Sequence, residues 1–149
     1  MSVRLSKVAA GNLEKVLKLS VGEDQKGFVA SNAVSIAQSK YYPALKTDAV
    51  YAGESMVGFA MYGFDPDDER FTLIRLMIDE KHQGKGYGRS ATKAVLKRLK
   101  EEEGCKAVFL SYVPANKAAA QLYKSIDFKQ TGEVDAESGE IVMKLDFSE

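Results

Sequence analysis

The sequence predicts a single α/β domain, built on a mixed and mostly antiparallel sheet with a parallel βαβ unit at its centre. Apolar segments of strand length alternate with segments of helical periodicity along all 149 residues, and no internal repeat or Pro/Gly/Ser linker separates them. Residues 71–78 are almost continuously apolar, which is typical of a strand covered on both faces. A helical segment and another apolar strand follow, and strands joined in this way run parallel. The expected order of elements is βααβββαβαββ, over residues 1–149.

The N-terminal half is expected to contribute one strand, two helices and a β-hairpin. Asn12 is placed to cap the first helix, and Ser31 or Asn32 to begin the second, because such side chains accept hydrogen bonds from free N–H groups at a helix start. Pro43 is expected to stop the second helix after Tyr41. The expected ranges are a strand at 3–8, a helix that carries Leu13, Val16 and Leu17, a helix from 31 or 32 to 41, and hairpin strands at 48–52 and 56–64.

The C-terminal half is expected to complete the sheet. The helix after the apolar strand carries apolar residues at helical spacing, and Gly104 is placed to end it. A strand at 107–112 is followed by a break at Pro114 and by an amphipathic helix that begins near Asn116. Two final strands are expected at 129–134 and 141–145, on either side of a polar turn. The crossover inside the βαβ unit should be right-handed.

Three alternate glycines mark the most specific segment, Gln83-Gly84-Lys85-Gly86-Tyr87-Gly88-Arg89, which lies between the apolar strand and its helix. Glycine lets a ligand approach the backbone closely, and the first N–H groups of a helix bind anions, so the segment predicts a phosphate site. It is not a nucleoside-triphosphate loop, because Lys85 is followed by Gly86 instead of Ser or Thr. It also departs from the dinucleotide fingerprint, since its spacing is G-x-G-x-G and it follows the fourth strand.

Composition and charge argue against several classes of protein. Lys plus Arg equals Asp plus Glu, 21 against 21, so no net field attracts nucleic acid or an anionic membrane. No segment has the length of a membrane span, and the first residues lack a signal-peptide pattern. One cysteine cannot form an internal disulfide, and one histidine argues against a zinc site. We therefore expect a cytoplasmic protein with no metal, nucleic-acid or membrane partner, and a homodimer is compatible with the sequence.

A second element accompanies the glycine segment: Asn116, then Ala119, Leu122-Tyr123 and Phe128. Residues 83–88 match the pattern Gln/Arg-x-x-Gly-x-Gly/Ala, and the two elements together resemble the GNAT superfamily of acetyl-CoA-dependent N-acetyltransferases. The resemblance covers nearly the whole chain and implies a GNAT-like fold, with acetyl-CoA as cosubstrate. Residues 25–35 and 57–63 show a weaker similarity to the small-amine branch of spermine/spermidine acetyltransferases.

The resemblance implies a role for each part of the motif. Backbone N–H groups of the glycine segment would hold the pyrophosphate, and the pantetheine arm would enter between splayed strands at 76–78 and 111–113. An N–H near Met77 or Ile78 would hold the thioester oxygen. The phenol of Tyr123 would return a proton to sulfur, although by position alone Tyr123 is a core residue and Asn116 a helix cap. The cofactor-binding residues implied are Leu76, Met77, Ile78, Gln83, Gly84, Lys85, Gly86, Tyr87, Gly88, Arg89 and Asn116.

The general base is not given by the motif. Several relatives carry a carboxylate in the strand before the glycine segment, where this chain has Ile74 and Arg75. We interpret Arg75 as part of a buried ion pair, with Asp79 or with an acid on a neighbouring strand. Ordered water, an acid from residues 23–24 and an acid from residues 65–69 all stay open as the base.

Cys105 and His82 are interpreted as residues without a catalytic role. Cys105 has no histidine close in sequence, so a small buried thiol is favoured over an acetyl-cysteine route. His82 adjoins the glycine segment, where an exposed loop side chain is favoured over a general base.

The resemblance places the acceptor amine between the first two helices and the hairpin, with Glu23, Gln25, Phe28 and Asn32 as substrate-binding candidates. Carboxylates and aromatic faces suit a polycationic amine such as spermidine or spermine, attacking acetyl-CoA directly in a ternary complex. An aminoglycoside, an amino acid or a protein N-terminus would use the same catalytic half. A non-catalytic acyl-CoA sensor is the alternative from another class, because the strand carboxylate is missing. Nucleic-acid binding through the basic helix is remote at zero net charge.

Overall fold

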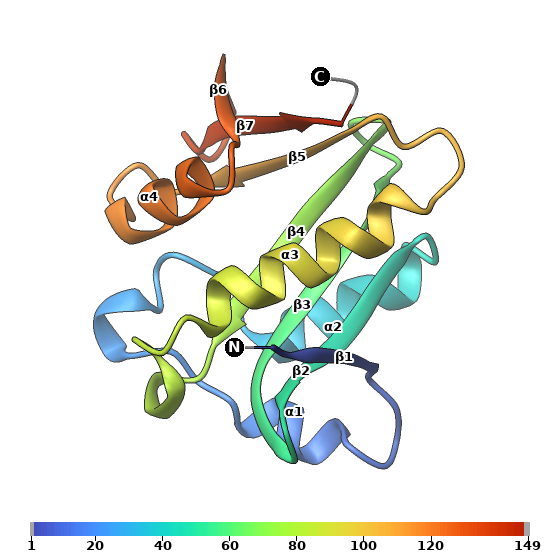
Figure 1. Ribbon diagram of the computed structural model, residues 1–149, viewed down its shortest axis with the longest axis vertical. Coiled ribbons are helices and arrows are strands. Elements are labelled where there is room, and N and C mark those ends of the chain that lie inside the picture. Colours follow the sequence, from blue (N-terminus) through green and yellow to red (C-terminus); the bar gives the residue numbers. More distant parts are fainter. Residues whose placement is uncertain (1, 148–149) are drawn as a thin grey trace.

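The structure is a computed structural model that describes residues 2–147, and these form one seven-stranded sheet flanked by helices (Figure 1). The strand order is β1-β2-β3-β4-β5-β7-β6, antiparallel except for the β4–β5 pair. The elements are β1 (Arg4–Lys7), α1 (Leu13–Lys18), η1 (Glu23–Gln25), α2 (Asn32–Tyr41), β2 (Leu45–Ala52), β3 (Ser55–Asp65), β4 (Arg70–Ile78), η2 (Glu80–His82), α3 (Tyr87–Lys100), β5 (Ala107–Tyr112), α4 (Lys117–Ser125), β6 (Lys129–Val134) and β7 (Ile141–Asp146).

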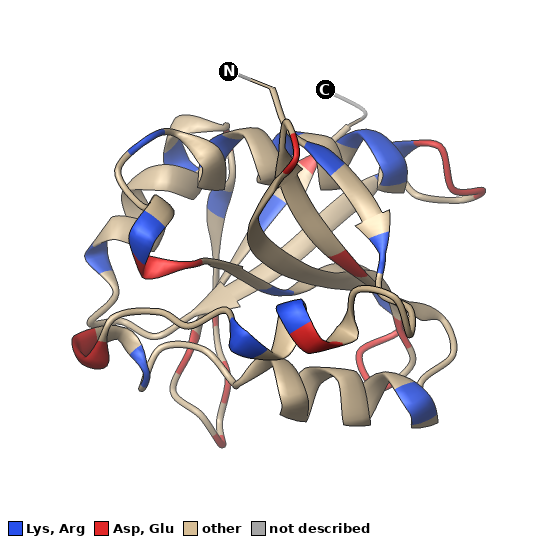
Figure 2. Ribbon diagram, turned by 90° about the horizontal axis from the view of Figure 1, so that it is seen from below, with Lys and Arg blue, Asp and Glu red and all other residues tan. Residues whose placement is uncertain are grey.

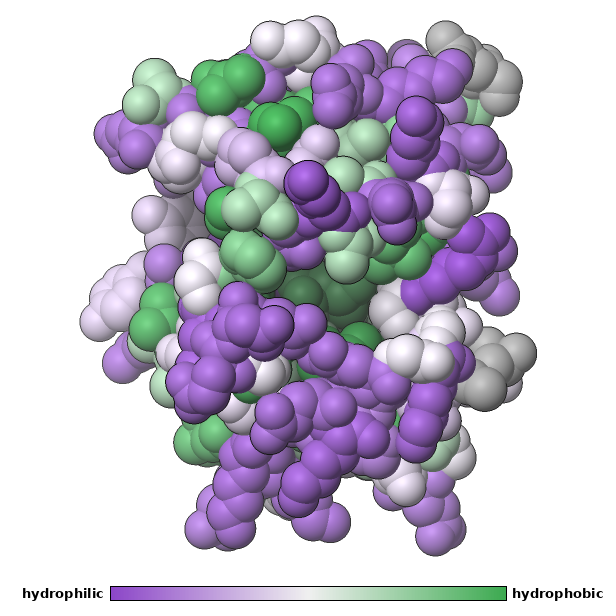
Figure 3. Space-filling model, turned by 90° about the vertical axis from the view of Figure 1, so that its left-hand side faces the viewer, coloured by the Kyte–Doolittle hydropathy of each residue, from purple (hydrophilic) through white to green (hydrophobic). Residues whose placement is uncertain are grey.

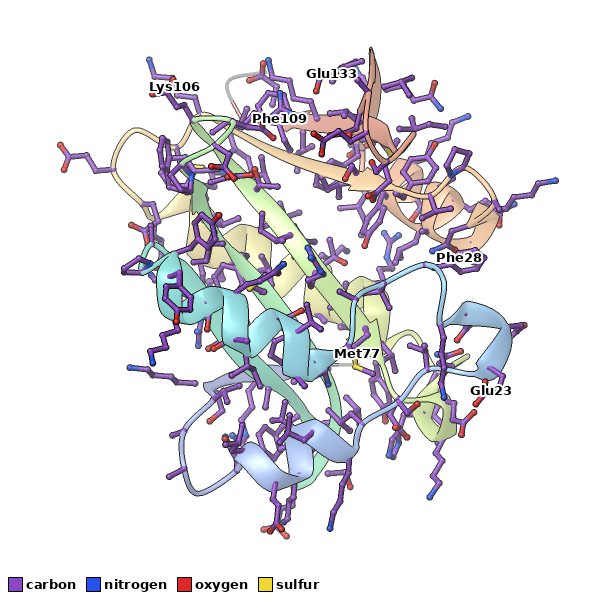
Figure 4. All side chains as sticks on the ribbon, turned by 180° about the vertical axis from the view of Figure 1, so that it is seen from behind. Glu23, Phe28, Met77, Lys106, Phe109 and Glu133 are labelled. Carbon is purple, nitrogen blue, oxygen red and sulfur yellow. The ribbon has the colours of Figure 1, made fainter. Side chains whose placement is uncertain are left out.

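Helices cover both faces of the sheet, as the continuous apolar character of β4 predicts. The helix α3 crosses one face (Figure 1), and its buried residues join strand side chains and the inner side of α4 in the larger core cluster. The helices α1 and α2 cover the opposite face (Figure 4), over a smaller cluster centred on Phe59, Met61 and Met77. Basic and acidic residues are interspersed over the molecule (Figure 2), consistent with 21 charges of each sign.

A buried polar network fastens α3 to the first strands. Asp48 is almost fully buried, and its carboxylate accepts hydrogen bonds from the Tyr62 hydroxyl and from Arg98 Nη1, the latter at 2.9 Å. Arg98 Nη2 also donates to the Leu5 carbonyl at 3.0 Å. Burial and then the bond to Asp48 raise the pKa of Tyr62. A buried carboxylate needs such partners, so this network fixes the position of α3 and hence of its N-terminus.

The central strands diverge, and this feature positions the site. β4 is paired along its length with β3, but it pairs with β5 only at Thr72 and Phe109. β5 is in turn paired along its whole length with β7. The guanidinium of Arg70 closes the paired end, because it stacks 4.2 Å from the Phe109 ring centre and forms an ion pair of 3.2 Å with Glu133 on β6 (Figure 4). The carboxyl ends of β4 and β5 are therefore free to separate.

The predicted fold class, element order and parallel central pair are confirmed, but two local expectations differ. Asn12 precedes α1, yet its side chain makes no cap bond, because Oδ1 accepts from Ala9 N and Nδ2 donates to the Lys7 carbonyl. The helix α3 ends at Lys100 and not at Gly104, because Glu102 N already bonds to Leu99 O in a tighter turn. Gly104 serves that turn with a φ of +79°.

Candidate active site

A cavity of about 680 Å³ opens where β4 and β5 diverge. Its lining comes from the carboxyl ends of both strands, the glycine segment, α4 and the segment between η1 and α2. Figure 3 shows the hollow, with hydrophobic residues at its base and a mixed rim whose most hydrophilic part lies below it. The predicted gap between residues 76–78 and 111–113 is thus present as a cavity that both strands line.

The glycine segment forms a loop that leads directly into α3. Gly84 and Gly86 have φ values of +78° and +85°, in the left-handed region that favours glycine, and Gly86 is the N-cap of the helix. The first intrahelical bond of α3 runs from Ser90 N to Gly86 O. The N–H groups of the helical residues before Ser90 therefore have no carbonyl acceptor within the helix. Gly84, Gly86, Tyr87 and Gly88 line the cavity, so the start of α3 adjoins it, and free N–H groups at a helix start are a geometry that suits an anion.

The edge of β4 offers a second backbone donor. Asp79 N donates to Val57 O at 2.8 Å, and Gly58 is opposite Ile78 in the antiparallel register. Because pairs alternate in such a ladder, the N–H and carbonyl of Ile78 point away from β3, toward β5. The Ile78 carbonyl accepts from Gln83 Nε2 at 2.9 Å, which agrees with this direction. The Ile78 N–H therefore faces the cavity between the diverging strands.

Tyr123 and Asn116 reach the cavity from α4. The Tyr123 ring packs edge-to-face against Phe128 at 5.8 Å, and its hydroxyl makes no hydrogen bond to another side chain or backbone group of residues 2–147. Burial raises the pKa of Tyr123 to about 12, so the phenol is protonated at neutral pH and can only donate a proton. Asn116 lines the cavity and caps α4, because its Oδ1 accepts from Ala119 N at 3.2 Å.

A reciprocal amide pair joins the glycine segment to η1. Gln25 Nε2 donates to Gln83 Oε1 at 3.1 Å, and Gln83 Nε2 donates to Gln25 Oε1 at 2.9 Å. The same Gln25 oxygen accepts from Gly22 N at 3.2 Å. Gln83 is thereby hydrogen-bonded to the segment between η1 and α2, which contributes Phe28 to the cavity lining (Figure 4).

The opposite face of the cavity is polar. Arg75 lines it, and its guanidinium donates to Gln38 Oε1 on α2 at 3.2 Å and to the Ile74 carbonyl at 3.3 Å. Within residues 2–147 Arg75 forms no ion pair, so the expected buried ion pair, with Asp79 or with an acid on a neighbouring strand, is wrong. Asp79 instead accepts hydrogen bonds from Ser20 N and Lys81 N. Burial lowers the pKa of Arg75, while the Glu140 carboxylate acts in the opposite direction.

Some sequence candidates lie outside the cavity lining. Lys85 is exposed, and Arg89 donates to Ser125 Oγ at 2.6 Å. Glu23 is exposed at the outer edge of the molecule (Figure 4), where it forms an ion pair of 2.7 Å with Lys26. Asn32 is buried under the lining, where its amide donates to the Val16 carbonyl at 2.9 Å and to Met77 Sδ at 3.8 Å.

Other residues singled out from the sequence do line the cavity. Of the two residues expected to have no catalytic role, His82 differs from its expected exposure and Cys105 does not. Gln25 and Phe28 contribute to the lining, as do Leu76, Met77, Ile78 and Gln83. His82 also lines it, half-buried with its ring 6.5 Å from that of Tyr87, so it is not the exposed loop residue that was expected. Cys105 lies away from the cavity, and burial raises the pKa of its thiol, in keeping with an inert cysteine.

Comparison with known proteins agrees with this geometry. The model of the acetyltransferase (GNAT) family matches residues 17–128. The chain belongs to the GNAT acetyltransferase family. A spermine/spermidine N(1)-acetyltransferase of Bacillus subtilis (strain 168) is 34% identical over 150 residues, covering 97% of this chain and 99% of the relative. A probable spermine N(1)-acetyltransferase of Bacillus subtilis subsp. natto is 33% identical over the same coverage.

Solved structures share the GNAT fold at low sequence identity. A spermidine N-acetyltransferase from Vibrio cholerae, in complex with CoA and spermine, superposes with a TM-score of 0.76 at 17% identity, covering 99% of this chain and 96% of that one. The aminoglycoside acetyltransferase AAC(6')-Ib in complex with coenzyme A and kanamycin superposes with a TM-score of 0.80 at 16% identity, covering 99% and 96%.

Family membership and full-length relatives establish the class of chemistry. The protein is an acyltransferase that uses acetyl-CoA and acts on amines. The lining suits that cosubstrate, because backbone donors meet the cavity at the helix start and at the strand edge. Across residues 2–147 there is no cluster of metal-ligating side chains, and none of the helices has the length and apolar character to cross a membrane.

Proposed function

We propose that the protein acetylates a polyamine such as spermidine or spermine, by direct attack of an amine nitrogen on acetyl-CoA in a ternary complex. The observation that carries the proposal is the cavity at the β4–β5 divergence, since it presents an anion-binding loop at one side and a polar pocket on the α2 face. Two relatives whose names specify spermine as a substrate cover nearly the whole chain and support the acceptor class. Cys105 lies outside the lining, which favours direct transfer over an acetyl-cysteine intermediate.

The chain's backbone supplies the binding and the electrophilic assistance. Free N–H groups at the start of α3 hold the pyrophosphate, where the positive end of the helix dipole adds attraction. The Ile78 N–H, which points toward β5, donates to the thioester oxygen as negative charge develops on it. Both donors are fixed before the ligand arrives, so they cost little reorganisation during the reaction.

Tyr123 serves the leaving group. As the new N–C bond forms, the C–S bond breaks, the nitrogen loses one proton, and the thiolate gains one from the Tyr123 hydroxyl. The phenol recovers that proton from solvent. A thiol has a pKa of roughly 8.5, below that of the buried phenol, so the Tyr123 hydroxyl first donates a hydrogen bond to sulfur in the transition state and passes its proton on only as solvent replaces it.

Proton removal from the amine falls to water. A free alkylamine has a pKa of roughly 10.4 and must be neutral to attack. Neither residues 23–24 nor residues 65–69 line the cavity, which leaves water in the open mouth as the proton acceptor among the three candidates from the sequence.

The test is a panel of amines with CoA release followed by a thiol reagent. Spermidine, spermine, kanamycin, free lysine and a peptide N-terminus are compared at equal concentration, and acetylated products are identified by mass spectrometry. We expect kcat/KM for spermidine or spermine to exceed that of every other amine by at least tenfold. Turnover of another class of amine in place of the polyamines would overturn the proposed acceptor.

A further inference from the structure

One carboxylate in the cavity has no role in the reaction described above. Within residues 2–147, Glu140 is the acidic side chain that lines the cavity. It belongs to neither of the two sequence motifs, so the sequence does not mark it as a functional residue. It lies immediately before β7, at the end of the β6–β7 turn. Phe28, Arg75 and Ser111 line the same cavity.

The turn holds Glu140 in a fixed place. Asp135 N donates to the Glu140 carbonyl at 2.9 Å, and Glu140 N donates to Ser138 Oγ at 3.2 Å. Ser111 Oγ on β5 donates to Glu140 Oε1 at 3.2 Å. A carboxylate has room for about four donors, so this single side-chain bond orients the group and leaves most of its acceptor capacity for a ligand.

The carboxylate lies on the face that α2 covers. Leu110 and Tyr112 of β5 belong to the larger core cluster with α3, and alternation along a strand puts Ser111, and with it the bound Glu140, on the other face. Arg75 reaches toward this face too, because it donates to Gln38 on α2. The glycine loop and Tyr123 approach from the side of α3 and α4. The cavity is therefore open to acetyl-CoA from that face of the sheet and to the acceptor amine from the face that α2 covers.

The local charge favours a cation beside Glu140. Arg75 is close enough to interact electrostatically with Glu140, yet the two form no ion pair within 4.0 Å in the described part of the chain. Arg75 is instead occupied by Gln38 and the Ile74 carbonyl. The half-buried carboxylate of Glu140 therefore has no cationic partner in direct contact among residues 2–147, and an alkylammonium ligand supplies one.

We propose that Glu140 is the specificity-determining residue of the acceptor site, binding an ammonium group of the amine while another nitrogen of that amine faces the thioester. This inference rests on the proposed function and adds the residue that selects a multiply charged amine.

The experiment compares Glu140→Gln with Glu137→Gln, which removes the same charge from an exposed position in the same turn. Initial rates are measured with spermidine over a range of concentrations, and acetyl-CoA affinity is measured by calorimetry. We expect KM for spermidine to rise about 10- to 100-fold in Glu140→Gln, the range for a lost charge-assisted hydrogen bond, with acetyl-CoA Kd within twofold of wild type. Glu137→Gln should match wild type in both values.

Two further variants make the result specific. Glu140→Asp keeps the charge but withdraws it by one methylene, so its KM should fall between those of wild type and Glu140→Gln. Ser111→Ala removes the orienting hydroxyl and should raise KM about two- to fivefold. Thermal melts confirm that each variant is folded.

The outcomes separate this inference from the proposed function. A wild-type enzyme that turns over no polyamine would refute the proposed function. A wild-type enzyme that acetylates spermidine, with Glu140→Gln kinetically equal to Glu137→Gln, would refute the role of Glu140 alone. A loss confined to kcat, with KM unchanged, would also refute it, because that pattern belongs to a group acting only in the transition state.

Discussion

Removing the Tyr123 hydroxyl should slow turnover with little effect on binding or folding. General acid catalysis contributes about 100- to 10,000-fold in typical enzymes. The pKa of about 12 for Tyr123 lies above that of a thiol, a mismatch that places the expected effect at the low end of that range. We therefore expect kcat of Tyr123→Phe to fall about 100-fold, equal to about 3 kcal/mol of transition-state stabilisation. The phenyl ring keeps its contact with Phe128 at 5.8 Å, so Tm should change by no more than about 2 °C.

The assay is steady-state CoA release with saturating acetyl-CoA and spermidine, combined with calorimetric titration of acetyl-CoA. Tyr112→Phe is the matched control, since Tyr112 also lines the cavity but its hydroxyl accepts from Gln130 Nε2 at 3.2 Å. The control should lose about 1 kcal/mol of stability with the hydrogen bond and keep its kcat within twofold. A kcat for Tyr123→Phe within threefold of wild type would refute the reasoning.

The raised pKa of Tyr123 also predicts a dependence of stability on pH. The folded chain keeps the phenol proton until about pH 12, whereas the unfolded chain loses it near pH 10, so this contribution is fully present below pH 10 and is lost as the pH rises toward 12. Between pH 9 and pH 11 the loss amounts to about 1 kcal/mol. Tyr123→Phe lacks the group, and its unfolding free energy in urea should fall by about 1 kcal/mol less than that of wild type over the same interval. Equal losses would contradict burial as the cause of the shift.

Three other substitutions test the framework of the site. Gly86→Asp forces a side chain onto a φ of +85° and sets a negative charge beside the phosphate site, so Kd for acetyl-CoA should rise at least tenfold, with Gly86→Ala between; binding within twofold of wild type would contradict the loop assignment. In Gly58→Ala the new Cβ would lie 2.4 Å from the Met77 carbonyl oxygen, so the free energy of unfolding in urea should fall by about 1–3 kcal/mol. Gly11→Ala, which has open space at its Cβ, is the control and should keep the stability of wild type. Equal stabilities of the two variants would show that β3 and β4 approach each other less closely. Gln25→Ala breaks the amide pair with the glycine loop and should raise acetyl-CoA Kd about fivefold by calorimetry, whereas an unchanged Kd would show that the pair does not support the loop.

Periodic elements were predictable from the sequence, because local spacing determines which face of an element is buried. β5 and β6 have the predicted bounds, and α2 begins at Asn32 after the Ser31 cap, whose hydroxyl accepts from Val34 N at 3.2 Å. The glycine loop was equally visible, since positive φ values at Gly84 and Gly86 leave a direct mark on the sequence.

The acceptor face was not predictable in the same way. Arg75 meets Gln38, which is 37 positions away, and no local pattern encodes that contact. Glu140 ends a polar turn, where an acidic residue is ordinary, and only the pairing of β5 with β7 brings it beside Ser111. Such side chains become visible as a site only when the sheet order is known, because the strands that carry them are joined by the fold and not by spacing.

In the proposed ternary complex the diverging strands hold both substrates at once, one on each face of the sheet. Initial velocities measured over a grid of acetyl-CoA and spermidine concentrations test this most directly. We expect lines that intersect in double-reciprocal plots, and no acetylated enzyme by mass spectrometry when acetyl-CoA is added alone. Parallel lines together with an acetyl group on the protein would contradict it, because the acetyl group would then leave CoA before the amine arrives.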